Sequence, residues 1–79
     1  MEIKVLGAGC SKCKTLLQNV ETALKELGVS AKVEKVEDIA QIVSFGIMST
    51  PALVIDGKVV LCGRVAGAGE LKKLIEKNL

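Results

Sequence analysis

The 79-residue sequence predicts an α/β fold in which strands and helices follow the order β-α-β-α-β-β-α. Short apolar runs alternate with segments whose apolar residues recur every three or four positions, which indicates strands alternating with helices. An Asp-Gly pair between two apolar runs near the end of the chain is typical of a two-residue hairpin. We therefore expect one domain over residues 1–79, with a four-stranded mixed sheet and helices on both faces.

The first part of the chain predicts a strand, a helix and a second strand. Residues 2–6 form a short strand that is apolar enough to lie at the centre of the sheet. Residues 11–27 have the apolar spacing of a helix, and Gly28 follows at the place where a left-handed residue ends a helix. Residues 31–36 alternate imperfectly and are predicted as the second strand.

The middle of the chain predicts a short helix followed by a strand. Asp38 can cap a helix that ends at Gly46. Pro51 is the only proline, and because proline cannot donate a hydrogen bond within a sheet, it is expected at the start of the strand 52–55.

The last part predicts an antiparallel hairpin and a closing helix. Asp56-Gly57 is expected to form a type I′ turn between residues 53–55 and 59–61. A terminal helix is predicted over residues 70–77. The two helical connections are expected to be right-handed crossovers that make a parallel portion of the sheet, to which the hairpin adds antiparallel strands.

Composition restricts the class of function. The net charge of +2 arises from eleven Lys and Arg scattered among nine Asp and Glu, and Phe45 is the single aromatic residue, so we expect no nucleic-acid partner. The chain starts with a strand pattern and carries neither a basic leader nor a long apolar run, which predicts a cytoplasmic protein without a membrane segment. Three cysteines in that compartment are more typical of catalysis or metal binding than of a structural disulfide framework.

Two cysteines, Cys10 and Cys13, lie where the first strand ends and the first helix begins. The first turn of a helix presents backbone N–H groups without partners and the positive end of the peptide dipoles, and both favour a thiolate over a thiol. Cys13 follows Cys10 by three residues and therefore lies beside it on a helix. This arrangement predicts a dithiol that cycles between open and closed forms.

The residues around these cysteines fit such a site. Gly7 and Gly9 permit the unusual backbone angles that a tight strand-to-helix connection requires. Lys12 and Lys14 add positive potential, although solvent and salt screen exposed lysines, so the helix terminus is expected to contribute more to any thiolate stabilisation.

The Cys-x-x-Cys after the first strand, Thr50-Pro51 before the third, the Asp-Gly hairpin and the closing helix together resemble the thioredoxin fold in its short, glutaredoxin-sized form. More narrowly, the whole chain is similar to the small thioredoxin-like, redox-active disulfide proteins of archaea and bacteria. The resemblance implies a protein disulfide oxidoreductase with Cys10 as the attacking thiolate and Cys13 as the resolving thiol. It also implies that Pro51 is a cis proline facing the disulfide and that Thr50 offers backbone groups to an extended substrate segment.

The sequence also gives expectations for the partners and for three further side chains, those of Cys62, Met48 and Arg64. We expect a monomer that exchanges electrons with protein disulfides and a dithiol reductase, without a bound cofactor or metal. Cys62 ends an apolar strand and is interpreted as a core or incidental thiol, and Met48 as a packing residue beside the Thr50-Pro51 loop. Arg64 replaces part of the glutaredoxin motif that seats glutathione and is interpreted as a surface arginine.

Two alternatives remain open at this point. Small copper and zinc carriers also place a Cys-x-x-Cys between a first strand and a helix, because two thiolates at this spacing bind soft metals. Such carriers normally run β-α-β-β-α-β and end in a strand, whereas this chain is predicted to end in a helix. The second alternative is a binding module whose dithiol acts as a sensor, with a partner that distinguishes its oxidised and reduced states.

Overall fold

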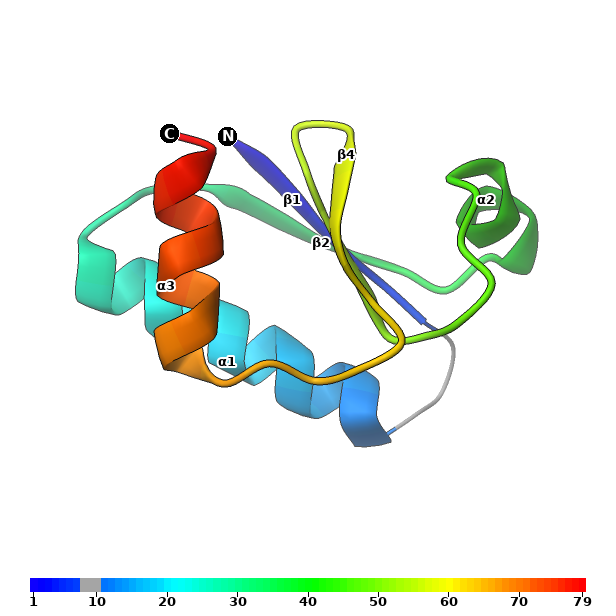
Figure 1. The fold of residues 1–79 in the computed structure, drawn as a ribbon, viewed down its shortest axis with the longest axis horizontal. Helices are drawn as coiled ribbons and strands as arrows, with labels where there is room; N and C mark the ends of the chain where they lie inside the picture. Colours follow the sequence, from blue (N-terminus) through cyan, green and yellow to red (C-terminus); the bar gives the residue numbers. More distant parts are fainter. Residues whose placement is uncertain (8–10) are drawn as a thin grey trace.

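The computed structural model describes residues 1–7 and 11–79, and its elements follow the predicted order (Figure 1). The strands are β1 (Glu2–Leu6), β2 (Lys32–Val36), β3 (Ala52–Ile55) and β4 (Lys58–Cys62). The helices are α1 (Ser11–Leu27), α2 (Ile39–Ser44) and α3 (Ala68–Lys77). The bounds of β1 and α1 are those predicted, while α3 begins two residues earlier than expected.

The four strands form one mixed sheet in the order β2-β1-β3-β4. β1 therefore lies in the interior of the sheet, as its apolar sequence predicted. It pairs parallel with β2 and antiparallel with β3, and β3 pairs antiparallel with β4. The sheet has helices on both faces, because α1 and α3 cover one face and α2 lies against the other (Figure 1).

The expectation of two parallel crossovers is wrong for the second connection. Val36 at the end of β2 and Ala52 at the start of β3 both pair with Leu6, so the chain leaves and re-enters the sheet at the same end. A six-residue helix such as α2 is about 9 Å long, whereas a five-residue strand spans about 16 Å. The short helix does not return the chain along the sheet, and β3 consequently runs antiparallel to β1.

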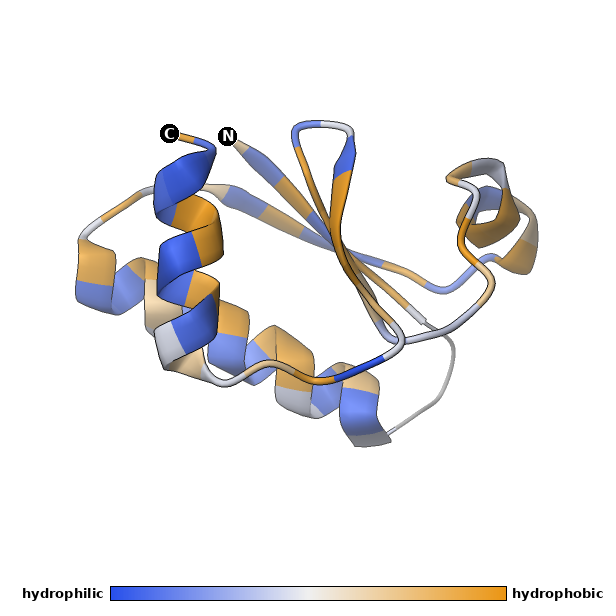
Figure 2. Ribbon diagram, viewed as in Figure 1, coloured by the Kyte–Doolittle hydropathy of each residue, from blue (hydrophilic) through white to orange (hydrophobic). Residues whose placement is uncertain are grey.

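The core is divided between the two faces of the sheet. The larger part lies between the sheet and helices α1 and α3, and Figure 2 shows the apolar bands of α3 turned toward the sheet. Its buried residues are Ile3, Val5, Leu16, Val20, Ala23, Leu24, Leu53, Ile55, Leu61, Ala66, Leu71 and Ile75. The smaller part lies under α2 and comprises Leu6, Val36, Ile42, Ile47, Ala52 and Val54. Aliphatic side chains thus build both halves of the core, in a sequence whose single aromatic residue is Phe45.

The hairpin turn and the α2 cap form as predicted. Asp56 and Gly57 have φ angles of 48° and 83°, and positive values at both positions are what a type I′ turn requires. The Asp56 carboxylate also accepts a hydrogen bond of 2.8 Å from the Glu2 backbone N–H, which ties the turn to β1. At α2, the Asp38 carboxylate accepts a bond of 2.9 Å from the Ala40 N–H.

Leu71→Ala tests the packing of α3 on the sheet. Leu71 is fully buried, so truncation removes its contacts and leaves a cavity, and we expect the free energy of unfolding to fall by about 2–5 kcal/mol. Glu76→Ala, on the exposed side of the same helix, is the control and should change the free energy of unfolding by less than about 0.5 kcal/mol. Urea denaturation of both variants measures the difference, and equal effects would contradict the described packing.

Candidate active site

Cys13 lies in the first turn of α1, and its side chain is almost completely buried, with 1% of its surface exposed. Cys10, the expected attacking thiolate, lies outside the described residues. Of the two cysteines, the structure therefore describes only Cys13, the expected resolving thiol. That thiol is at the positive end of a 17-residue helix, where the peptide dipoles favour negative charge.

Gly7, the residue that follows β1, lies directly against the thiol of Cys13. A Cβ atom built on Gly7 would overlap the Cys13 Sγ and would lie 3.6 Å from the Cβ of Thr50. The Gly7 φ angle of 156° is a backbone conformation that side chains rarely adopt, and its N–H donates to the Val36 carbonyl at 2.9 Å. The lack of a side chain at Gly7 thus allows Cys13 and Thr50 each to approach Gly7 at the carboxyl end of β1.

Thr50 and Pro51 come from the loop that precedes β3. The Thr50–Pro51 peptide bond is cis, as the resemblance implied. Pro51 is buried and Thr50 is exposed, so the loop presents Thr50 on the surface near the buried Cys13. The Pro51 carbonyl accepts a hydrogen bond of 2.9 Å from the Gly63 N–H, which ties this loop to the end of β4.

Of the two interpretations of Cys62, a core or an incidental thiol, the core position is wrong, because its side chain is exposed. Cys62 pairs with Ala52 at the end of the edge strand β4, where no helix covers it in the described part of the chain. Its Sγ lies 3.4 Å from the Ser49 carbonyl and donates to it. This thiol therefore lies next to the Thr50–Pro51 loop, outside the core.

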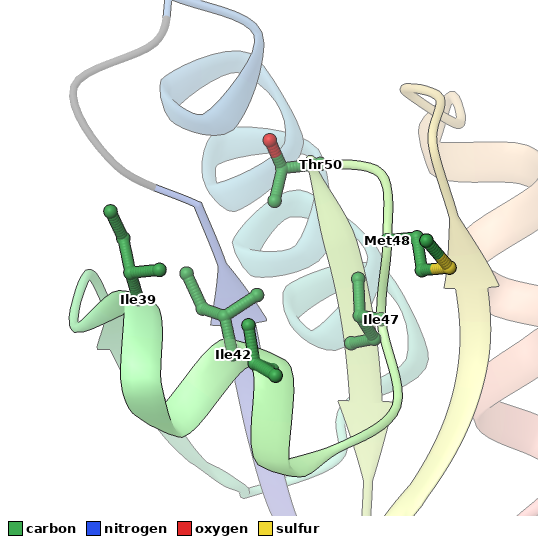
Figure 3. A pocket seen from close by; sticks show the side chains of 6 residues that line it. Ile39, Ile42, Ile47, Met48 and Thr50 are labelled. Carbon is green, nitrogen blue, oxygen red and sulfur yellow. The ribbon is translucent and has the colours of Figure 1, made fainter.

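The interpretation of Met48 as a packing residue is also wrong, since 98% of its surface is exposed. It borders a pocket of about 290 Å³ between α2 and the Thr50–Pro51 loop, which Figure 3 shows with its side chains. The pocket is lined by Ile39, Ile42, Val43, Ile47, Met48 and Thr50. Sequence analysis did not identify this pocket. The sequence did contain an indication of it. The short helix α2 carries three large apolar residues, and a helix of six residues cannot bury all three against the sheet.

Arg64 forms an ion pair with Glu70 near the start of α3, through two hydrogen bonds, one of them 2.9 Å long. The hydrogen bonding between the two side chains lowers the pKa of the Glu70 carboxyl and raises the pKa of the Arg64 guanidinium. Both side chains are largely exposed, so the pair contributes little to stability. Arg64 is thus a surface residue, as predicted, but one whose charge is compensated.

Within residues 1–7 and 11–79, no group of three or more His, Cys, Asp or Glu side chains is placed to hold a metal ion. None of the helices in these ranges is both long and apolar enough to cross a membrane.

Gly7→Ala tests the close approach at the site. The added methyl group would collide with the Cys13 Sγ in a strained backbone conformation, and we expect the free energy of unfolding to fall by roughly 2–4 kcal/mol. Gly69→Ala is a matched control, because a Cβ there meets no described atom within 4 Å and Gly69 lies in a helix. This control should stabilise the protein by roughly 0.5–1 kcal/mol. A neutral Gly7→Ala variant would contradict the described geometry.

The different burial of Cys13 and Cys62 predicts different reactivity. In the reduced, folded protein, iodoacetamide should modify Cys13 roughly tenfold or more slowly than Cys62, because a buried thiol is inaccessible to the reagent. Peptide mass spectrometry of samples quenched over time measures both rates. In concentrated urea the two rates should converge, and equal rates in the folded state would show that Cys13 is not buried.

The chain matches known proteins along most of its length. Residues 1–76 match the family model described as a thioredoxin domain. A thioredoxin from Methanothermobacter thermautotrophicus is 40% identical over 75 residues, which cover 95% of this chain and 97% of that protein. A thioredoxin from Methanocaldococcus jannaschii is 32% identical over 77 residues, or 98% of this chain and 88% of that protein. This chain accordingly belongs to the thioredoxin family and is a thioredoxin-type disulfide oxidoreductase.

Proposed function

We propose that this protein exchanges electrons with disulfides of partner proteins through Cys10 and Cys13, with Thr50 and Pro51 contacting the substrate. The single observation that supports this assignment most strongly is that the Cys13 thiol and Thr50 both approach Gly7 at one end of the sheet. A substrate segment that reaches Thr50 is thereby brought close to the Cys13 thiol. Family membership supports disulfide chemistry in general, and this geometry supports these residues in particular.

The proposed reaction is two successive thiol-disulfide exchanges. The Cys10 thiolate attacks one sulfur of the substrate disulfide, so that a mixed disulfide forms and the other substrate sulfur leaves as a thiolate, which takes up a proton. Cys13, deprotonated, then attacks the Cys10 sulfur. The Cys10–Cys13 disulfide forms and the second substrate thiol is released. Two electrons pass to the substrate, and a dithiol reductase partner restores the protein by the reverse exchange.

The burial of Cys13 supports its assignment as the resolving thiol. A buried thiol is poorly accessible to a large substrate but can react with a neighbouring residue three positions away. The comparisons lend no support to the metal-carrier alternative, and the closing helix α3 differs from the terminal strand of such carriers. A single domain, a monomeric state, a cytoplasmic location and the absence of a nucleic-acid partner stay predictions of the sequence.

The first test is the reduction potential of the thiol pair. Metal-free protein is equilibrated in a graded dithiol buffer, and the trapped thiols are weighed by mass spectrometry. We expect one two-electron transition between roughly −120 and −300 mV, with an internal Cys10–Cys13 bridge. Failure to form that bridge, or capture of Cu(I) or Zn(II) in its place, would contradict the proposal.

Cysteine variants test the two roles. Cys10→Ser should abolish disulfide reduction, whereas Cys13→Ser should still attack the substrate and accumulate a mixed disulfide that is not resolved. Cys62→Ser is the control and should retain the wild-type rate, because the mechanism does not use this thiol. Non-reducing mass spectrometry after reaction with a protein disulfide distinguishes these outcomes. Accumulation of the mixed disulfide in Cys10→Ser instead would reverse the assignment of attacker and resolver.

A further inference from the structure

The surface next to Thr50 is unusually apolar. Ile39, Val43 and Met48 are 70%, 62% and 98% exposed, although aliphatic side chains of this size are usually buried. They line the pocket of about 290 Å³ together with Ile42, Ile47 and Thr50, and Figure 3 shows the lining side chains on α2 and on the loop that leads to Thr50. Contiguous exposed apolar surface of this kind marks an interaction site.

Thr50 lies both at this pocket and close to the Cys13 thiol. It is a lining residue of the pocket, and its Cβ is also within 3.6 Å of the position that a Gly7 side chain would occupy beside Cys13. Figure 3 shows Thr50 between the pocket residues of α2 and the first turns of α1. A polypeptide that presents a disulfide to this site can therefore place a neighbouring side chain in the pocket.

The first turn of α1, which carries Cys13, is basic. Lys12 and Lys14 are both exposed in the first turn of α1, on either side of Cys13 in the sequence, and that turn contains no acidic residue. Neither lysine forms an ion pair within residues 1–7 and 11–79. The positive end of the helix dipole adds to their charge. This turn therefore presents uncompensated positive charge beside the thiol.

The other charged groups near the site are engaged with partners. Arg64 is paired with Glu70, and Lys35 lies 3.5 Å from Glu37. The Asp38 carboxylate accepts the hydrogen bond that caps α2. The described surface around Cys13 thus has two unequal sides, an apolar pocket on the α2 side and two unpaired lysines on the α1 side.

We propose that the preferred partner is a polypeptide whose reactive cysteine has a large aliphatic residue on one side and acidic residues on the other. The aliphatic side chain occupies the pocket formed by α2 and Met48, and the carboxylates face Lys12 and Lys14. This inference rests on the proposed function and adds the chemistry of the partner to it. The two exchange steps are unchanged, because the pocket and the lysines only position the disulfide.

The test uses short synthetic peptides, each with one cysteine linked through a disulfide to the same neutral thiol, mercaptoethanol. The flanking residues are leucine or serine on one side and glutamate or lysine on the other, in both sequence orders. The second-order rate constant for reaction with the reduced protein is measured for each peptide. We expect leucine to exceed serine by about tenfold and glutamate to exceed lysine by about fivefold at low salt.

Salt separates the two contributions. The Debye length falls from about 30 Å at 0.01 M to about 3 Å at 1 M ionic strength, so the preference for glutamate should decline steeply. The preference for leucine depends on apolar burial and should persist at high salt. A glutamate preference that does not change with salt would contradict the role of the two lysines.

Variants assign each preference to its side of the site. Met48→Ser should reduce the leucine-to-serine ratio toward one, and Lys12→Glu combined with Lys14→Glu should reverse the glutamate preference. Leu79→Ser and Lys25→Glu are controls: Leu79 is an exposed apolar residue at the chain end, and Lys25 lies in the last turn of α1. Both should retain the wild-type ratios. Unchanged ratios in the pocket and lysine variants would overturn the inference.

The proposed function and this inference fail in different ways. If the reduced protein reacts with every peptide at the same rate, the partner preference is wrong while disulfide exchange stands. If it reacts with none of the peptides and not with hydroxyethyl disulfide either, the proposed function itself is wrong.

Discussion

The close approach of the Gly7 backbone to the Cys13 thiol is the constraint on which the site depends. It requires a residue without a side chain directly after the central strand, in a backbone conformation that is strained for other residues. The Gly7 N–H is held by the Val36 carbonyl, and the strand before it pairs on both sides. The sheet thereby fixes the point at which the first turn of α1 and the Thr50–Pro51 loop come together.

The unequal cover of the two sheet faces explains why this site has an apolar border. On one face, α1 and α3 enclose the larger part of the core, and their exposed sides are polar. On the other face, α2 has six residues and buries Ile42, which leaves Ile39 and Val43 open to solvent. Because α2 and the loop that follows it lie at the same end of the sheet as Cys13, the uncovered apolar surface is next to the thiol.

Much of the fold could be predicted because its signals are local. The strand at 2–6, the helix at 11–27 and the Asp56-Gly57 turn follow from periodicity and turn chemistry within a few residues, and all three are confirmed. The exposure of Met48 and Cys62 could not be predicted in this way. Whether an apolar or thiol side chain is buried depends on which distant element covers it, and for these two residues no described element does.

The sequence by itself determined the order of elements, the spacing of Cys10 and Cys13 at a strand-to-helix junction, and the resemblance that family membership confirms. The tertiary structure decided the direction of β3, the approach of Cys13 and Thr50 to Gly7, and the pocket between α2 and the Thr50–Pro51 loop. The pairing of β3 with β1 and the approach of Thr50 to Gly7 join residues that are more than thirty positions apart. Their geometry depends on strand register and on the length of a connecting helix, which local sequence patterns do not specify.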